Sequence, residues 1–215
     1  MDKKLAVIVG VGPLLGKHLG LEFASHGFDV VLIARNEVSL KRFKQEFDER
    51  KYNAYIYTAD CSDFLSLDKT FDLIVKEHGI PNVFIYNTGI TTADPQHLTS
   101  TDLERHFRVD TAAAYHLSAK LINDPRFKAI HGTLLFTGGG LATAPSAQYL
   151  PLSMDKAALR AMAYALNESL KKDGIYVGTF TVCDVIGKNS YYAPENIARD
   201  FYKLYETRSQ VEIVH

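Results

Sequence analysis

The stretch LAVIVGVGPLLGKHLG, residues 5–20, decides the fold of this chain. Five apolar residues lead into a turn that holds Gly10 and Gly12, and Gly16 lies where an amphipathic helix is expected to begin. A strand that runs through a glycine turn into a helix is typical of a site for nucleotide phosphates. One glycine allows the tight turn, one lets the backbone approach a pyrophosphate, and one lets the helix pack closely on the strand. The free N–H groups and the dipole of the helix would face the anion.

The composition argues against several classes of partner. A chain of 215 residues fits a single domain with a sizeable core. Its formal net charge is -1 and its Lys and Arg residues form no basic stripe, so we expect no nucleic-acid partner. No run of about 18 apolar residues occurs, so we expect no membrane span. The N-terminal residues do not continue into a secretory signal, which predicts a cytoplasmic location.

The two cysteines do not indicate a metal site or a disulfide scaffold. Cys61 and Cys183 are far apart and show no CxxC spacing. We expect both to be buried thiols, and we expect no metal centre.

Strands and helices alternate along the chain. Short β-branched and apolar runs predict strands at residues 5–9, 29–34, 54–58, 83–87, 132–136, 176–182 and 211–214. Helical patterns lie near residues 16–25, 37–49, 66–78, 102–123, 152–172 and 195–207. This alternation predicts an α/β fold, because right-handed crossovers place helices on both faces of a parallel sheet. We therefore expect one Rossmann-type doubly wound domain over residues 1–215, with a seven-stranded, mostly parallel sheet.

Local signals place the ends of several helices. Three helices should stop at Gly27, Gly79 and Gly174, because glycine readily adopts the left-handed conformation that ends a helix. A capping box at Thr101–Glu104 should start the fourth helix.

In a doubly wound sheet the ligand binds beyond the carboxyl ends of the strands, so the residues there are candidates for binding. Arg35 and Asn36 follow the second strand, where an acidic residue would hold a ribose diol. An arginine suits a 2'-phosphate instead, although it could also be a solvated loop cation. Asp60 and Cys61 follow the third strand and could meet an adenine edge. Asp60 could equally be a turn-forming residue.

The ordered set of the glycine turn, Arg35, Asp60, Asn87-Thr-Gly89 and Lys156 resembles the short-chain dehydrogenase/reductase family. The resemblance implies a Rossmann fold, an NAD(P) cofactor and oxidation or reduction of an alcohol or carbonyl. Arg35 favours NADP(H) over NAD(H). The residues expected to bind this cofactor are Gly10, Gly12, Leu15, Gly16, Arg35, Asn36, Asp60, Cys61, Asn87, Gly89 and Lys156. The turn departs from the family's TGxxxGxG pattern, since Val9 replaces its Thr and Leu14 its middle glycine.

The catalytic half departs further from the family pattern. Lys156 matches the family's lysine, but Leu152 stands at the position of its tyrosine. Gly139 falls at the position of the family's serine and Asp110 at that of its asparagine. Leucine cannot transfer a proton, so the family's ordinary mechanism cannot run at position 152.

Two residues near Lys156 carry a group that can transfer a proton. Tyr149 is the nearest phenol, and it is either a catalytic candidate or a loop tyrosine that packs on the surface. Asp155 is adjacent to Lys156 and is expected to point to a different part of the helix surface. Lys156 could bind the nicotinamide ribose without the tyrosine, unless it is an exposed helix cation.

Two functions from different classes therefore stand. The first is an NADP(H)-dependent oxidoreductase that acts on a small carbonyl or alcohol and uses water or Tyr149 as a proton donor. The second is a dinucleotide-binding protein without turnover that senses NADPH or acts through a partner. By resemblance we also expect a homodimer or homotetramer built on the helices near 102–123 and 152–172. Ala112–Ala114 and Ala157, Ala158 and Ala161 would allow close packing across a two-fold axis, or else pack on the chain's own sheet.

Overall fold

A seven-stranded sheet runs through the computed structural model, which describes residues 4–215. Its strands are β1 (Leu5–Val9), β2 (Asp29–Ala34), β3 (Ala54–Thr58), β4 (Val83–Tyr86), β5 (Thr133–Gly139), β6 (Tyr176–Val182) and β7 (Glu212–Val214). They lie in the order β3-β2-β1-β4-β5-β6-β7, and every pair is parallel. The predicted doubly wound sheet is thus confirmed, and it is parallel throughout.

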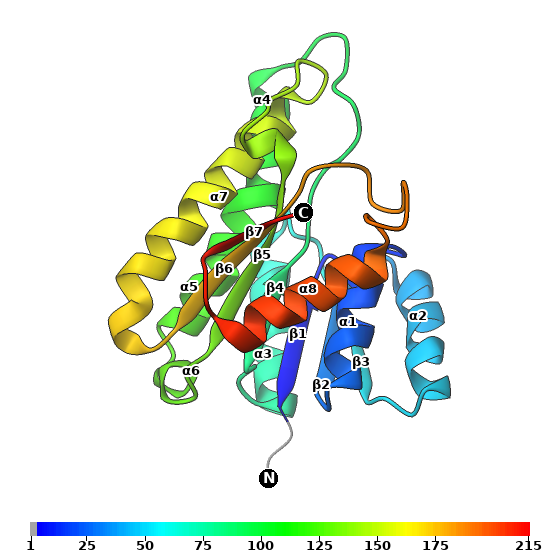
Figure 1. Cartoon of the computed structure of the whole chain (residues 1–215), viewed down its shortest axis with the longest axis vertical. Coiled ribbons are helices and arrows are strands. Elements are labelled where there is room, and N and C mark those ends of the chain that lie inside the picture. Colours follow the sequence, from blue (N-terminus) through cyan, green and yellow to red (C-terminus); the bar gives the residue numbers. More distant parts are fainter. Residues whose placement is uncertain (1–3) are drawn as a thin grey trace.

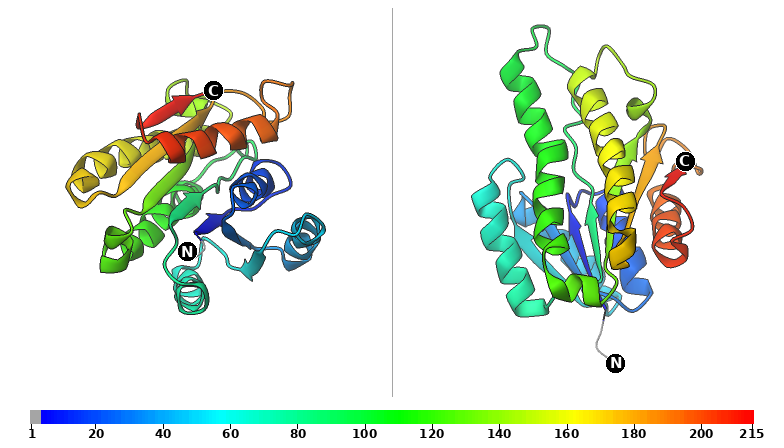
Figure 2. Two further views of the ribbon diagram at one scale, coloured as in Figure 1. Left: turned by 60° about the horizontal axis from the view of Figure 1, so that its bottom comes forward. Right: turned by 90° about the vertical axis from the view of Figure 1, so that its left-hand side faces the viewer.

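Helices cover both faces of this sheet (Figures 1 and 2). The α-helices are α1 (Leu15–Ser25), α2 (Glu37–Glu49), α3 (Phe64–His78), α4 (Ser100–Phe107), α5 (Ala113–Ile122), α6 (Pro125–Ala129), α7 (Leu150–Leu170) and α8 (Pro194–Thr207). A π-helical segment, η1 (Arg108–Ala112), joins α4 to α5, and short 3-10 turns lie at η2 (Gly140–Ala142) and η3 (Lys171–Asp173). Helices α1, α2 and α8 pack on one face, whereas α3, α5 and α7 pack on the other.

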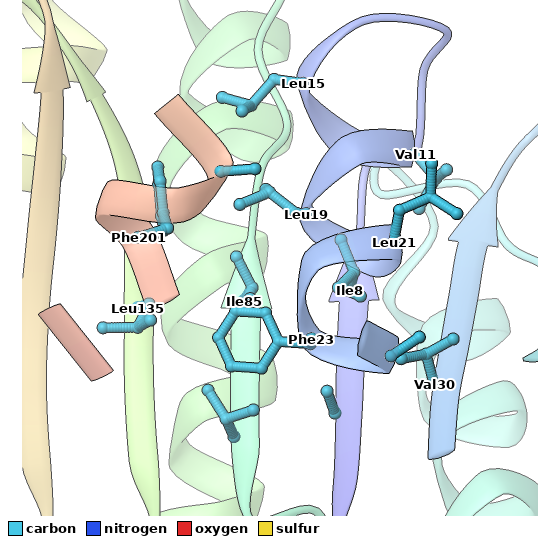
Figure 3. Packing of buried hydrophobic residues seen from close by; sticks show 14 of the residues in the cluster. Ile8, Val11, Leu15, Leu19, Leu21, Phe23, Val30, Ile85, Leu135 and Phe201 are labelled. Carbon is cyan, nitrogen blue, oxygen red and sulfur yellow. The ribbon is translucent and has the colours of Figure 1, made fainter. Parts of the chain in front are cut away.

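Alternating strand residues supply the two hydrophobic clusters. In β1, Ala6 and Ile8 belong to the cluster under α1 and α8, while Val7 and Val9 belong to the cluster under α3, α5 and α7. All four side chains are at most 1 % exposed. Figure 3 shows the first cluster, in which Phe23 of α1 lies against the sheet. Burial on both faces explains why the strands read as continuous apolar runs rather than as alternating ones.

The ends of several elements differ from the sequence expectation. The fourth helical stretch begins with a capping box between Thr99 and Asp102, which starts two residues before the predicted Thr101–Glu104 box. Thr99 has the extended conformation that an N-cap requires, and its side chain accepts a hydrogen bond from the N–H of Asp102. The first two glycines of Gly138–Gly140 belong to β5, which is longer than predicted. The three predicted glycine stops are confirmed, because Gly27, Gly79 and Gly174 all have positive φ.

No helix among residues 4–215 is both long enough and apolar enough to cross a membrane.

Candidate functional site

A cavity of about 620 Å³ opens at the carboxyl ends of β1, β2 and β4. The chain connects β1 to β2 on one side and later enters β4 on the other, so this is the point where the strand order reverses. Its lining includes Gly10, Gly12, Arg35, Asn36 and Asp60, together with Cys61, Asn87 and Gly89. Eight of the expected cofactor-binding residues therefore meet in one cavity. Leu15, Gly16 and Lys156 do not line it.

Two of the three glycines of the turn have a steric reason to be glycine. Gly10 has φ of 88°, and a Cβ there would lie 2.6 Å from the carbonyl oxygen of Asn87. A Cβ on Gly16 would lie 2.7 Å from the backbone of Gly10 and of Val11, so only glycine lets α1 pack this closely. Gly12 is different, because a Cβ there would have no neighbour within 4 Å. Gly12 faces the open cavity, where a missing side chain leaves its backbone accessible.

The N-terminus of α1 lies beside this turn without a side-chain cap. Its N-cap residue is Leu14, which makes no capping hydrogen bond, and the first turn holds no acidic residue. The N–H of Lys17 donates to the carbonyl oxygen of Gly12 at 3.1 Å, whereas the N–H groups of Leu15 and Gly16 and the dipole remain available to an anion. Pro13 lines the cavity but has no N–H to donate. The side chain of Leu15 is 3 % exposed and lies in the hydrophobic cluster (Figure 3), so only its backbone could meet a cofactor.

Two arginines border the cavity beyond β2. Arg35 follows β2 directly, and Arg42 lies farther along α2. Both are exposed at the cavity rim, with Ser39 between them in sequence. Asn36 is the N-cap of α2, and its side-chain oxygen accepts a hydrogen bond of 2.9 Å from the N–H of Ser39. The sequence reading missed Ser39 and Arg42, although helical spacing from Asn36 places positions 39 and 42 on one side of α2.

Asp60 is both a turn residue and a cavity residue. Its Oδ1 accepts hydrogen bonds of 2.8 Å from the N–H and from the hydroxyl of Ser62. The bond from the Ser62 N–H is the main cause that holds the pKa of Asp60 below its usual range, and the charge of Arg35 acts in the same direction. The adjacent Cys61 is buried, and burial raises the pKa of its thiol.

Asn87 ties the glycine turn to the centre of the sheet. Its Nδ2 donates to the carbonyl oxygen of Gly10 at 2.8 Å, and its Oδ1 accepts from the hydroxyl of Thr137 at 2.8 Å. The ends of β1, β4 and β5 are thereby held in one arrangement.

Lys156 is buried rather than exposed. Its ammonium donates to the carbonyl oxygen of Thr137 at 2.9 Å and to that of Thr88 at 3.4 Å, at the ends of β5 and β4. Only the backbone of Gly89 separates it from the cavity lining, since a Cβ on Gly89 would lie 3.4 Å from Nζ. Burial lowers the pKa of Lys156, while the charges of Asp110 and Asp155 act in the opposite direction. The alternative of an exposed helix cation is therefore excluded.

Asp110 lies next to this lysine. It comes from the π-helical segment, is 1 % exposed, and accepts the N–H of Ile90 at 3.0 Å on each of its carboxylate oxygens. A Cβ on Gly89 would lie 3.9 Å from its Oδ2. Burial raises the pKa of Asp110, and the charge of Lys156 is the first of the effects that oppose the rise.

The expectation that Asp155 points away from the site is wrong. Its side chain is 2 % exposed, and one of its oxygens lies within 4.8 Å of ligand atoms of Asp110 and His106. The helix α4 and the segment η1 pack on the side of α7 that carries Asp155, so a position adjacent to Lys156 is buried as well. Burial, followed by the charge of Asp110, raises the pKa of Asp155 to about 7.

Leu152 and Tyr149 lie at the start of α7. Leu152 is buried, whereas Tyr149 is the partly exposed N-cap residue, and its carbonyl accepts the hydroxyl of Ser153 at 2.7 Å. Tyr149 lies outside the lining of the 620 Å³ cavity. A Cβ on Gly139 would contact Lys156 Cγ at 3.6 Å.

The two thiols differ from each other. Cys183 is exposed, so the prediction of two buried thiols holds only for Cys61. It follows β6, where the chain leaves the sheet.

Known proteins resemble this chain over nearly all its length. A probable oxidoreductase named EphD from Mycobacterium tuberculosis is 26 % identical over 219 residues, which cover 97 % of this chain and 36 % of that protein. The 7alpha-hydroxysteroid dehydrogenase of Escherichia coli is 24 % identical over 83 % of this chain and 71 % of its own length. The chain thus spans about a third of the length of the first of these relatives.

Solved structures share the fold. The alcohol dehydrogenase of Thermococcus sibiricus, in complex with 5-hydroxy-NADP, has a TM-score of 0.86 at 18 % identity and covers 100 % of this chain and 96 % of its own. A variant actinorhodin polyketide ketoreductase with NADPH has a TM-score of 0.89 at 15 % identity, with 99 % and 95 % covered. A family model described as short chain dehydrogenase matches residues 4–185. This chain belongs to the short-chain dehydrogenase family.

Proposed function

We propose that the chain is an oxidoreductase that binds NADP(H) in the 620 Å³ cavity and interconverts a carbonyl and an alcohol. The glycine turn carries this proposal most directly, because its backbone and the uncapped N-terminus of α1 border the cavity at the switch point of the sheet. The residues fit a dinucleotide, since Gly12 leaves its backbone open where a diphosphate would lie.

The preference for NADP(H) over NAD(H) rests on Arg35 and Arg42. Both guanidinium groups border the part of the cavity beyond β2, where the adenosine ribose of a dinucleotide is held in this fold. A 2'-phosphate is a strong acceptor for arginine, and the nearby hydroxyl of Ser39 can donate to it. No carboxylate immediately follows β2, so a ribose diol would lack its usual acceptor.

When bound, the nicotinamide supplies or accepts the hydride, and the protein must position the substrate and manage the proton. The Lys156 ammonium lies next to Gly89, which lines the cavity. Leu152 offers no proton, so Lys156 is the group of this chain that could place a proton on the substrate oxygen, with Tyr149 as an alternative donor.

A dinucleotide-binding protein without turnover is the second candidate. The observation in its favour is the apolar, buried Leu152 at the position where the resemblance puts the family's tyrosine, together with Gly139 in place of its serine. Such a protein would bind NADPH and reduce nothing.

Turnover separates the two candidates. Oxidation of NADPH is followed with a panel of aldehydes, aliphatic and aromatic ketones and steroid ketones, for the wild-type chain, Lys156→Met and Tyr149→Phe. A wild-type rate that is lost in Lys156→Met supports the oxidoreductase. Tight NADPH binding with no rate on any carbonyl class supports the binding protein. Loss of the rate in Tyr149→Phe would identify the phenol as the donor.

We also propose that the chain forms a homo-oligomer through the outer sides of α4, α5 and α7. Exposed apolar side chains gather there, namely Phe107, Tyr115, Leu150, Met154 and Tyr164. Ala157 and Ala161 are exposed on the same side of α7, whereas Ala113 and Ala114 pack on the chain's own sheet. Sedimentation of the wild-type chain should show a dimer or tetramer that Met154→Lys dissociates.

A further inference from the structure

Four ionisable side chains meet inside the protein near Gly89, and none of them lines the 620 Å³ cavity. They are His106 of α4, Asp110 of η1, and Asp155 and Lys156 of α7, and each is at most 7 % exposed. The nearest ligand atoms of His106, Asp110 and Asp155 all lie within 4.8 Å of one another. We call these four residues the buried acid cluster.

Two polar atoms in this cluster have no hydrogen-bond partner. Among the side chains of residues 4–215 they are the buried polar atoms without one: Nδ1 of His106 and Oδ2 of Asp155. An unpaired buried polar atom is costly, so such atoms call for a physical explanation. The side chains that carry these atoms lie close together, because a ring nitrogen of His106 and one carboxylate oxygen each of Asp110 and Asp155 lie within 4.8 Å of one another.

Charge balance indicates what the region holds. Lys156 brings one positive charge, and two ionised carboxylates would leave a net negative charge in a buried place. The ammonium gives hydrogen bonds to the carbonyl oxygens of Thr137 and Thr88, so it does not bond the free oxygen of Asp155. With an uncharged imidazole at His106, a single proton on the two carboxyl groups would make the cluster neutral.

A divalent metal ion fits this region less well. Three ligand atoms with His and carboxylate chemistry are present, but the Lys156 ammonium lies beside them and would repel a second cation. A proton satisfies the charge without that repulsion.

The backbone here is shaped to bring the two carboxyl groups together. The π-helical segment Arg108–Ala112 inserts an extra residue between α4 and α5, and Asp110 lies at its centre. The hydroxyl of Thr111, the next residue, donates to the backbone carbonyl of Asp155 at 3.2 Å and so fastens η1 to α7. Such interruptions of a helix are frequent at functional sites.

We propose that Asp110 and Asp155 share one proton in the folded protein and form, with Lys156, the acid–base group that stands in for the phenol absent at position 152. The shared proton is a property of the unliganded chain, whereas its use in reduction rests on the proposed function. The groups that face Asp155 in the described residues are Asp110 from η1, His106 and Glu104 from α4, and Lys156 from its own helix.

The chemistry of the step balances. A bound nicotinamide would supply the hydride to the carbonyl carbon, and the Lys156 ammonium would give a proton to the carbonyl oxygen. The resulting amine takes the proton that the two carboxyl groups share, and that pair is protonated again from water. The alcohol oxidation follows the same path in reverse. Asp110 and Asp155 thus act through Lys156, as positioning and proton-holding residues.

The test observes the carboxyl groups of the unliganded chain directly. The protein is labelled with ¹³C at the side-chain carboxyl of aspartate, and the signals are followed against pH for the wild type, Asp155→Asn, Asp110→Asn and the control Glu104→Gln. We expect one wild-type carboxyl to titrate far above the ordinary aspartate range. That signal should vanish in Asp155→Asn, and its midpoint should fall in Asp110→Asn because the neighbouring charge is gone. Glu104→Gln should leave it unchanged.

Several outcomes would overturn the proposal. Ordinary midpoints for both carboxyl groups would do so, as would a high midpoint that Glu104→Gln moves as much as Asp110→Asn does. A stoichiometric divalent metal ion, found by elemental analysis of the purified protein, would also overturn it. The metal ion, and not a shared proton, would then balance the charge of the two carboxyl groups. NADPH binding is measured separately. If the chain does not bind NADPH, the proposed function fails, but the carboxyl titration still tests whether Asp110 and Asp155 share a proton.

Discussion

The ammonium of Lys156 donates a hydrogen bond of 2.9 Å to the carbonyl oxygen of Thr137 from a buried position. The lysine therefore serves as a link between α7 and the carboxyl end of β5, as well as the nearest cation to Asp110 and Asp155. Any substitution of Lys156 changes both the packing of α7 and the charge of the buried acid cluster.

Replacing Lys156 by methionine should destabilise the protein as well as remove its chemistry. The two carboxyl groups then lose the positive charge beside them, and two carbonyl oxygens lose their donor. We expect a loss of about 2 kcal/mol or more in the free energy of unfolding, measured by urea denaturation. The exposed Lys172→Met is the control and should change it by less than about 0.5 kcal/mol. Equal stability of the two variants would show that Lys156 is not the counter-charge of the cluster.

The protein should lose stability as the pH rises from about 4 to about 7. Asp155 has a pKa raised from 3.8 to about 7, so between these values the folded chain binds more protons than the unfolded chain. The free energy of unfolding then falls with pH across this window, and we expect a fall of about 1 to 2 kcal/mol.

The variant Asp155→Asn checks this assignment, because an amide neither titrates nor carries the charge. Its unfolding free energy should be flatter than that of the wild type over the same window and higher than it at the alkaline end. A wild-type curve that rises with pH, or an unchanged slope in Asp155→Asn, would contradict the account.

Two alanine substitutions in the turn should have opposite consequences. Gly10→Ala forces a side chain into a backbone with φ of 88° and to within 2.6 Å of the Asn87 carbonyl, so the fold should lose at least about 2 kcal/mol. Gly12→Ala meets no atom within 4 Å, so it should leave thermal stability almost unchanged and weaken NADPH binding. Similar melting temperatures for the two variants would contradict the prediction that Gly10 is needed for the fold and Gly12 for NADPH binding.

The sequence predicts the sheet and most of the cavity because both depend on local patterns. Apolar runs identify the strands, and residues at the ends of parallel strands must meet at one edge. Arg35, Asp60 and Asn87 are found on this basis. The burial of the Leu15 side chain was not predicted, because its backbone begins the helix at the turn while its side chain enters the core.

The buried acid cluster could not be predicted from the sequence, because it depends on packing between distant elements. Position 155 is adjacent to Lys156, and only the packing of α4 and η1 against α7 shows that both side chains are buried. The π-helical segment that carries Asp110 has no reliable local signal. Arg42 was not predicted, because the sequence does not show which face of α2 is turned toward the cavity.

Calorimetric titration with NADPH and with NADH tests the central claim most directly. The wild-type chain should bind NADPH more tightly than NADH. The variant Arg35→Asp should lose about 10- to 100-fold in affinity for NADPH, as removal of a charged hydrogen bond predicts. The remote, exposed Lys172→Asp should bind as the wild type does. Binding of neither dinucleotide, or an affinity for NADPH that Arg35→Asp does not change, would contradict the account.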